Sequence, residues 1–319
     1  MKEMPQARAD LHVHTSYSAW RHLRLIHTRD SYLEPRDAYE AAFRAGMDFA
    51  AITDHDAIEG ALRLRGSKGV DPERVIVGEE VECRFPETGQ WVHVSVFGLD
   101  EAEHARLQAL RSDVRELCAF CREERLLFVL NHPFQSFRWQ KPIQAYIEDV
   151  LSLFTHVEGL NGGVHSLQNR AVSALCACAA EHGRTLVQVG GSDAHTRRRV
   201  GSAYTQARAA TAAEFLAEIE AGRCAVGGTT DSTVGLLRDV YTNVGRYYVN
   251  LCTGRGEAPS AAAYAVDAAV ASLCLPAAIG GLPFASVLAS QAVQKAVSRM
   301  ALDSLHQMDW SRGTLPART

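Results

Sequence analysis

Histidines and aspartates recur in three short motifs, and these residue types bind metal ions. His12 and His14 lie in ADLHVHT, while ITDHD and GSDAH each contribute an aspartate and a histidine. Residues two apart on a strand point to the same face, so such a pair can bind one ion together. A single HxH is equally compatible with a half-buried strand that carries two polar residues. The presence of all three motifs in one chain predicts a metal site.

The predicted metal ligands all lie in, or just after, an apolar run. They are His12, His14, Asp54, His55, Glu80, His93, His132, Asp193 and His195. Six imidazoles and at least two carboxylates exceed the donors that one tetrahedral ion uses. Nitrogen and oxygen donors suit zinc, manganese or iron. We therefore expect two or three divalent metal ions as cofactors.

Several of these assignments leave alternatives open. A carboxylate among apolar residues needs a cation or hydrogen-bond donors, which favours Glu80 in VGEEVECRF, with Glu79 and Glu82 as competitors. His93 and His132 are alternatively histidines of the core. Asp10 has the same strand parity as His12 and His14.

The expected chemistry is hydrolysis, because neighbouring ions activate water and stabilise both the attacking and the leaving oxygen. Asp193 and His195 are the predicted catalytic residues at the metal. Arg197 and Arg198 follow in HTRRRVG together with Arg199, and arginine forks match phosphate oxygens. We predict that Arg197 and Arg198 orient a phosphate; the alternative is a solvated basic loop.

The elements that must position these residues alternate between short apolar runs and helical stretches. This alternation predicts an α/β protein with a mostly parallel sheet, closed as a barrel, with the polar residues at the carboxyl ends of its strands. RVIVGEEVECRF and QWVHVSVFGLD, joined by PETGQ, predict a hairpin. A helix is expected over roughly residues 103–124. We expect the barrel over residues 1–228.

Residues 229–319 predict a mainly helical C-terminal extension of unknown role. Alanine-rich helices are expected there, broken at Pro276, Gly280, Gly281 and Pro283. Asp267 and these breaks argue against a transmembrane segment. The extension is expected to pack on the barrel or on a second copy of the chain, which makes a homo-oligomer possible.

Composition limits the classes of function. The net charge of −4 in 319 residues gives no indication of nucleic-acid binding. The N-terminus lacks the apolar core of a signal peptide. Eight cysteines without a framework-like spacing suggest reduced thiols and a cytoplasmic location. Cys118 and Cys121 form a CxxC within a helical pattern, without a second pair to complete a zinc site.

The order of the motifs resembles the polymerase and histidinol phosphatase (PHP) family of metal-dependent phosphoesterases. HxH, TDH, a glutamate, a histidine, NHP and SDAH follow one another over about residues 8–205. The resemblance implies a distorted (β/α)7 TIM-like barrel, a trinuclear metal site and phosphoester hydrolysis. It does not cover the C-terminal extension.

Carried over by motif, the resemblance implies three groups of ligands. His12, His14 and Asp193 would bind one ion and share Glu80 with a second ion, which His93 and His132 complete; His55 and His195 would bind the third, with Asp54 as an outer or alternative ligand.

One departure from the family pattern affects the third ion. Family members often carry a further ligand a few residues after HxH, where this chain has Ala19. His22, His27 or Asp30 in the following insertion could replace it, or the third site could be weak.

The leading hypothesis is a phosphoesterase that hydrolyses a small phosphorylated metabolite or nucleotide by metal-activated water. The first alternative is an amidohydrolase-like enzyme that cleaves C–N bonds, because related barrels with similar clusters perform that reaction. The second is a metal-binding regulatory module whose catalytic site has lapsed.

Overall fold

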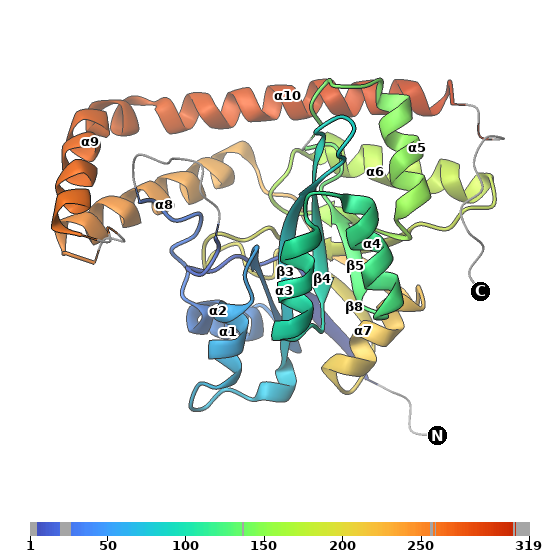
Figure 1. The fold of residues 1–319 in the computed structure, drawn as a ribbon, viewed down its shortest axis with the longest axis horizontal. Coiled ribbons are helices and arrows are strands. Elements are labelled where there is room, and N and C mark those ends of the chain that lie inside the picture. The colour runs from blue at the N-terminus through green and yellow to red at the C-terminus, as the bar shows by residue number, and fades with distance from the viewer. Residues whose placement is uncertain are drawn as a thin grey trace.

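The computed structural model describes residues 5–19, 27–135, 137–255, 258, 260–308 and 310, and shows a strongly curved sheet surrounded by helices (Figure 1). The strands are β1 (Gln6–Asp10), β2 (Phe49–His55), β3 (Val75–Arg84), β4 (Trp91–Phe97), β5 (Leu127–Asn131), β6 (His156–Asn161), β7 (Val187–Gly191), β8 (Ala203–Arg208) and β9 (Cys224–Gly228). The helices are α1 (Pro35–Arg44), α2 (Glu59–Arg65), α3 (Glu101–Leu110), α4 (Val114–Glu123), α5 (Ile143–Leu153), α6 (Ser166–Glu181), α7 (Ala212–Glu220), α8 (Thr233–Cys252), α9 (Ala261–Gly280) and α10 (Leu282–Leu305), with a 3-10 turn at Pro72–Arg74.

The sheet has the strand order β7-β6-β5-β4-β3-β2-β1-β8-β9. The pairs β1–β2, β2–β3, β5–β6 and β6–β7 are parallel, and the other four pairs are antiparallel. The prediction of a mostly parallel sheet is therefore wrong. The expected hairpin is present as β3 and β4, and the short connection of residues 85–90 leaves no room for the crossover that a parallel pair needs.

The first seven strands close into a distorted barrel at the carboxyl ends of β1 and β7. Val13 and Ala194 form a parallel bridge, in which the amide of His14 donates to the carbonyl of Ala194 at 2.9 Å. Toward the amino end of β1, residues 6–9 pair antiparallel with β8. The predicted α/β barrel is confirmed, and its distortion arises because the closure uses one bridge in place of a full ladder.

Two apolar clusters hold the barrel together. The inner cluster combines alanines of the strands, such as Ala9 and Ala51, with larger residues, and it includes Phe215 and Ile219 of α7, which are fully buried. The outer cluster lies between the strands and the surrounding helices. Truncation of a buried phenylalanine such as Phe215 to alanine typically costs about 3–5 kcal/mol.

The helix expected over residues 103–124 is divided into α3 and α4, so that prediction is wrong at its centre. Asp113 has extended backbone angles, and its side chain accepts a hydrogen bond from the amide of Arg115. An aspartate in this position caps a new helix because its carboxylate satisfies a free amide of the first turn. Local capping at Asp113 therefore starts α4 as a separate helix.

The C-terminal region is helical, and its breaks differ in part from the prediction. α9 continues through Pro276, where a break was expected. A helix can tolerate one proline when the hydrogen bonds on both sides of it are kept. Gly281 ends α9 with φ of 120°, and Pro283 lies in the first turn of α10. α10 runs back over the molecule and packs on α5 and α6 (Figure 1).

By length and composition alone, α9 could cross a membrane. Its 20 residues contain an 18-residue window with a mean hydropathy of 1.7, of which 11% is buried. The prediction of no transmembrane segment relied partly on a break at Pro276 that the structure does not contain. The absence of a transmembrane segment therefore stays a prediction. Asp267, the charged residue of α9, is 2% exposed and contacts His27 of the barrel.

Candidate metal centre

The candidate metal centre lies where the barrel strands end. His12 and His14 follow β1, and His55 is the last residue of β2. His132 and Asp193 come just after β5 and β7, and both have left-handed backbone angles, with φ of 26° and 54°. Such conformations cost on the order of 1–3 kcal/mol each in residues other than glycine. The surrounding fold therefore holds these two side chains at some energetic cost.

Glu80 of β3 is the centre of this cluster. Its Oε2 lies 3.3 Å from Nε2 of His12, 3.2 Å from Nε2 of His14 and 3.3 Å from Nε2 of His55. Its Oε1 lies 3.3 Å from Nδ1 of His93 and 3.1 Å from Nε2 of His132. Burial by itself would raise the pKa of Glu80, but the imidazoles outweigh it and hold that pKa well below its usual range.

Asp193 joins His12 and His14 on the other side of the cluster. Its Oδ1 lies 3.7 Å from Nε2 of His12 and 3.6 Å from Nε2 of His14. Four groups of three residues each bring their donor atoms within 4.8 Å of one another. They are His12–Glu80–His132, His12–His14–Asp193, His14–His55–Glu80 and His14–Asp30–His195.

The donor set fits divalent metal ions. Oε2 of Glu80 is buried and accepts no hydrogen bond from the described residues, although three imidazole nitrogens face it. The Nε2 atoms of His12 and His14 face each other at 3.0 Å. Ligands about 2.0–2.1 Å from one tetrahedral ion lie about 3.3 Å apart, close to this separation. These atoms are arranged for cations between them.

Asp30 supplies a carboxylate in place of the ligand that the family pattern has near Ala19. Its Oδ2 lies 3.0 Å from Nε2 of His195 and 3.7 Å from Nδ1 of His14. Burial favours the neutral acid, but His195 outweighs it and lowers the pKa of Asp30. His27 instead contacts Asp267, and His22 lies outside the described residues. Asp30 therefore completes the donor group His14–Asp30–His195.

Asp54, a predicted ligand, is not part of the cluster. Neighbouring residues of a strand point to opposite faces, so Asp54 points away from the side that holds His55. Its carboxylate accepts hydrogen bonds from the amide and, at 2.7 Å, from the hydroxyl of Thr15. Burial raises the pKa of Asp54 to about 7. The structure gives Asp54 the role of fixing the loop after His14.

Asp10 also lies outside the cluster, despite its parity with His12. Its carboxylate accepts hydrogen bonds from the amides of Ser192 at 2.8 Å and Gly201 at 2.7 Å. Burial raises its pKa to about 6. Asp10 thus ties the end of β1 to the segment that carries Asp193.

Strand parity also separates Glu80 from its competitor Glu79. Glu79 is buried on the opposite face, where its Oε2 lies 2.9 Å from both Nδ1 of His104 and Nε2 of Gln108 on α3. Glu82, two residues after Glu80, lies 3.7 Å from Nε2 of His93 at the rim. Among the three glutamates, Glu80 is the one that all five imidazoles surround.

The arginines after Asp193 pair with carboxylates away from the cluster. Arg197 contacts Asp37 and Glu40 of α1, both at 3.1 Å. Arg198 contacts Asp239 of α8 at 2.9 Å. These contacts do not support the prediction that Arg197 and Arg198 orient a phosphate, because their charges are already used to dock helices on the barrel.

Sequence reasoning missed Glu158 of β6. Its Oε1 lies 2.9 Å from Nδ1 of His12, and its Oε2 accepts from the amide of His132 at 2.9 Å. A carboxylate of this kind fixes the ring orientation and tautomer of a metal-binding histidine. The signal was a glutamate inside the apolar run THVEGLNG, the same signal that selected Glu80.

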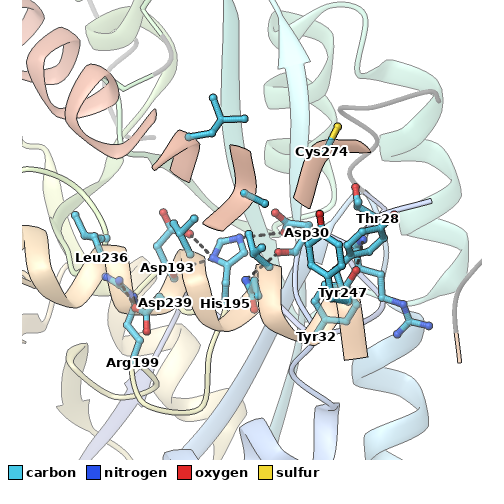
Figure 2. Close-up of a pocket in the computed structure, with 18 residues that line it drawn as sticks. Thr28, Asp30, Tyr32, Asp193, His195, Arg199, Leu236, Asp239, Tyr247 and Cys274 are labelled. Carbon is cyan, nitrogen blue, oxygen red and sulfur yellow. Dashed lines mark hydrogen bonds and ion pairs between the residues drawn. The ribbon is translucent and has the colours of Figure 1, made fainter. Parts of the chain in front are cut away.

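A cavity of about 570 Å³ opens beside the cluster. Asp30, Asp193 and His195 line one side, and residues of α8, α9 and α10 line the other. Figure 2 shows His195 joined to Asp193 and Asp30, with Leu236, Tyr247 and Cys274 among the surrounding residues. The cluster is therefore accessible from a space large enough for a small organic molecule.

Residues 177–224 match a family model described as PHP-associated. The resemblance to the PHP family is confirmed. The matched segment runs from the second half of α6 to the start of β9 and contains Asp193 and His195.

A relative of this PHP-like chain is an uncharacterized protein of Methanocaldococcus jannaschii. It is 34% identical over 74 residues, which are 23% of this chain and 43% of that protein. The chain thus matches less than half the length of this curated relative.

Three solved structures share part of the fold. A protein of Bifidobacterium adolescentis, provisionally described as a metal-dependent phosphoesterase, is 18% identical, with 59% of this chain and 88% of that chain covered and a TM-score of 0.41. An amidohydrolase of Chromobacterium violaceum is 16% identical, with 60% and 89% covered and a TM-score of 0.45. The lesion-specific endonuclease EndoQ of Pyrococcus furiosus is 15% identical, with 70% and 58% covered and a TM-score of 0.44. At these values the likeness concerns the fold alone.

Proposed function

We propose that this protein is a metal-dependent hydrolase that cleaves phosphoesters of small molecules. The observation that carries the proposal is the carboxylate of Glu80 among five imidazoles, beside a cavity that reaches Asp193 and His195. Dense donor sets of this kind bind two or more divalent ions. The PHP-associated match supports phosphoester chemistry for this donor set.

The proposed ligands are the four donor groups described above, with His93 beside Glu80. When bound, the metal ions would supply a Lewis acid for the phosphate oxygens and activated water. In the overall reaction, water adds its oxygen to phosphorus, the bond from phosphorus to the organic oxygen breaks, and that oxygen leaves as an alcohol with a proton from water.

The chain's own residues prepare this reaction in three ways. Glu158 holds His12 in one orientation through its Nδ1, which leaves Nε2 directed at the cluster. Asp193 and His195 line the cavity together with Asp30, so these donor residues would meet the substrate. Glu80 is fully buried and supplies negative charge behind them.

The experiment is metal analysis and hydrolysis on the same sample. The protein is purified without chelator, its zinc, manganese and iron are counted per chain, and phosphate esters are compared with amides and lactones. We expect two or three ions and chelator-sensitive release of phosphate. Hydrolysis of amides alone would support the C–N hydrolase instead. Bound metal without any turnover would support the lapsed regulatory module.

The remaining expectations concern partners and location. We propose that a second copy of the chain covers the exposed apolar side chains of α9 and α10, such as Leu273 of α9 and Leu282 of α10, which are 83% and 61% exposed. We also propose a cytoplasmic location, consistent with eight free cysteines.

A further inference from the structure

The cavity beside the metal cluster has two chemically different walls. Toward the barrel it is lined by polar residues. Asp30, Asp193 and His195 belong to the donor groups, and Thr28, Arg29 and Tyr32 lie beside Asp30 in the chain. Toward the C-terminal helices it is lined mainly by apolar side chains. These come from α8 (Leu236, Val240, Val244), α9 (Cys274, Ala278) and α10 (Leu282).

The apolar wall follows from the spacing of residues on α8. Leu236, Val240, Val244 and Tyr247 recur at intervals of three or four residues and so share one face of the helix. This face is turned to the cavity. Tyr241 and Val249 of the same helix are 37% and 55% exposed on other faces. α8 therefore presents an organised apolar surface to the metal cluster.

The polar groups of the helical wall are largely used within the protein. Asp239 accepts hydrogen bonds from Thr196 and Arg198 at 2.7 and 2.9 Å and also pairs with Arg199. Tyr248 donates its hydroxyl hydrogen to the carbonyl of Ala271 at 3.0 Å. A polar ligand placed against this wall would lose hydrogen bonds to water and gain few in return.

Arg199 is also committed, although it borders the cavity. Its guanidinium donates to the carbonyl of Gly162 at 3.0 Å and pairs with Asp239, and the residue is 3% exposed. Asn243 donates to the backbone carbonyl of Asp30 at 3.4 Å. Among the described residues of the helical wall, the Tyr247 hydroxyl is a buried group without a hydrogen-bond partner. The wall can therefore offer a substrate at most a few directed polar contacts.

We propose that the cavity holds the organic group of the substrate and that this group is apolar. The substrate would then be a phosphate ester of a hydrophobic alcohol or phenol. Its phosphate would lie at the metal ions that Asp193 and His195 would help to hold, and its apolar part against α8, α9 and α10. A cavity of about 570 Å³ lies in the size range of sites that enclose whole organic ligands. This inference rests on the proposed phosphoesterase function and names the class of substrate for it.

The test compares esters that differ in size and polarity. 1-Naphthyl phosphate is large and apolar, ribose 5-phosphate is of similar size and polar, and methyl phosphate is small. The metal-loaded protein is titrated with each ester by calorimetry, and KM is measured where turnover occurs. Binding is the primary measure because aryl oxygens leave more easily than alkyl oxygens, which affects kcat independently of the cavity. We expect at least tenfold tighter binding of the naphthyl ester than of the ribose ester.

Matched variants test whether the preference for the naphthyl ester arises in the cavity. Val240→Trp fills the space in front of α8, whereas Val249→Trp makes the same change on an outer face of that helix. We expect Val240→Trp to weaken binding of the naphthyl ester at least tenfold and Val249→Trp to change it less than twofold. Metal content and the thermal midpoint are measured for each variant. If Val240→Trp fails to fold, Ala278→Leu fills the cavity from α9, in the same apolar wall.

The outcomes separate this inference from the proposed function. Equal binding of the naphthyl and ribose esters, or the same loss in both tryptophan variants, would overturn the apolar-substrate inference while phosphoester hydrolysis still stood. A tenfold preference for the naphthyl ester that Val240→Trp removes, without hydrolysis of any phosphate ester, would support the cavity assignment and reject the phosphoesterase.

Discussion

The barrel wall and the helical wall of the cavity are stabilised in different ways. On the barrel side, His12, His14 and Glu80 are each 1% exposed or less, and strand pairing and buried hydrogen bonds position the backbone near them. On the helical side, α8 and α9 are exposed over much of their surface and contact the barrel through a few ion pairs. Under the proposed function, the barrel would hold the metal ions and the helices would contact the organic part of the substrate.

The largest effect is expected from the centre of the barrel wall. Glu80→Gln keeps the shape of the side chain but removes the negative charge that five imidazoles share. We expect the loss of at least one metal ion per chain and a fall in kcat of about 10³-fold or more, as charge at a metal site is lost. Elemental analysis and steady-state kinetics measure both.

Glu79→Gln is the matched control for that prediction. Glu79 is the adjacent buried carboxylate, but it faces His104 and Gln108 on the outer side of the strand. Metal content and kcat should stay near those of the native protein. A comparable loss of metal in both variants would show that general disruption of β3, and not ligation by Glu80, is responsible.

A smaller effect is expected from the carboxylate behind His12. Glu158→Gln weakens the contact that orients Nδ1 of His12 and leaves the donors themselves in place. Removal of such an outer contact typically lowers metal affinity or activity about 10–100-fold. Titration of the metal-free protein with Zn²⁺ measures the affinity. An unchanged affinity would contradict the orienting role of Glu158.

The contact between the two walls is expected to affect stability more than chemistry. Asp267 of α9 is 2% exposed and accepts a hydrogen bond from the amide of His27 at 3.2 Å. Asp267→Ala should lower the free energy of unfolding by about 1.5–3 kcal/mol, the usual contribution of hydrogen bonds to a charged group. Urea denaturation measures this change. Loss of bound metal in the same variant would show that the two walls are not independent.

The smallest effect on catalysis is expected on the outer surface of the helical wall. Leu273 is 83% exposed on α9. If a second copy of the chain covers this surface, Leu273→Ser should shift the molar mass in light scattering from that of a dimer toward that of a monomer, while kcat changes less than twofold. A native protein that is already monomeric at all concentrations would reject the oligomer.

The candidate metal ligands were the part of the site most predictable from the sequence. Alternation along a strand places His12 and His14 on one face, and the apolar residues around Glu80 imply that its charge is paired. Eight of the nine predicted ligands lie in the structural cluster, namely His12, His14, His55, Glu80, His93, His132, Asp193 and His195. Asp54 was misplaced because the TDH motif does not show which of two adjacent residues faces inward.

The sequence by itself determined the barrel, the donor types and their positions at strand ends, because these depend on short-range periodicity and on the cost of buried charge. Only the tertiary structure decided that Asp30 completes a donor group with His14 and His195, that Glu158 orients His12 and that Arg198 pairs with α8. Each of these contacts joins segments far apart in the chain. Long-range packing brings such residues together, and local sequence patterns do not encode which distant partner each side chain meets.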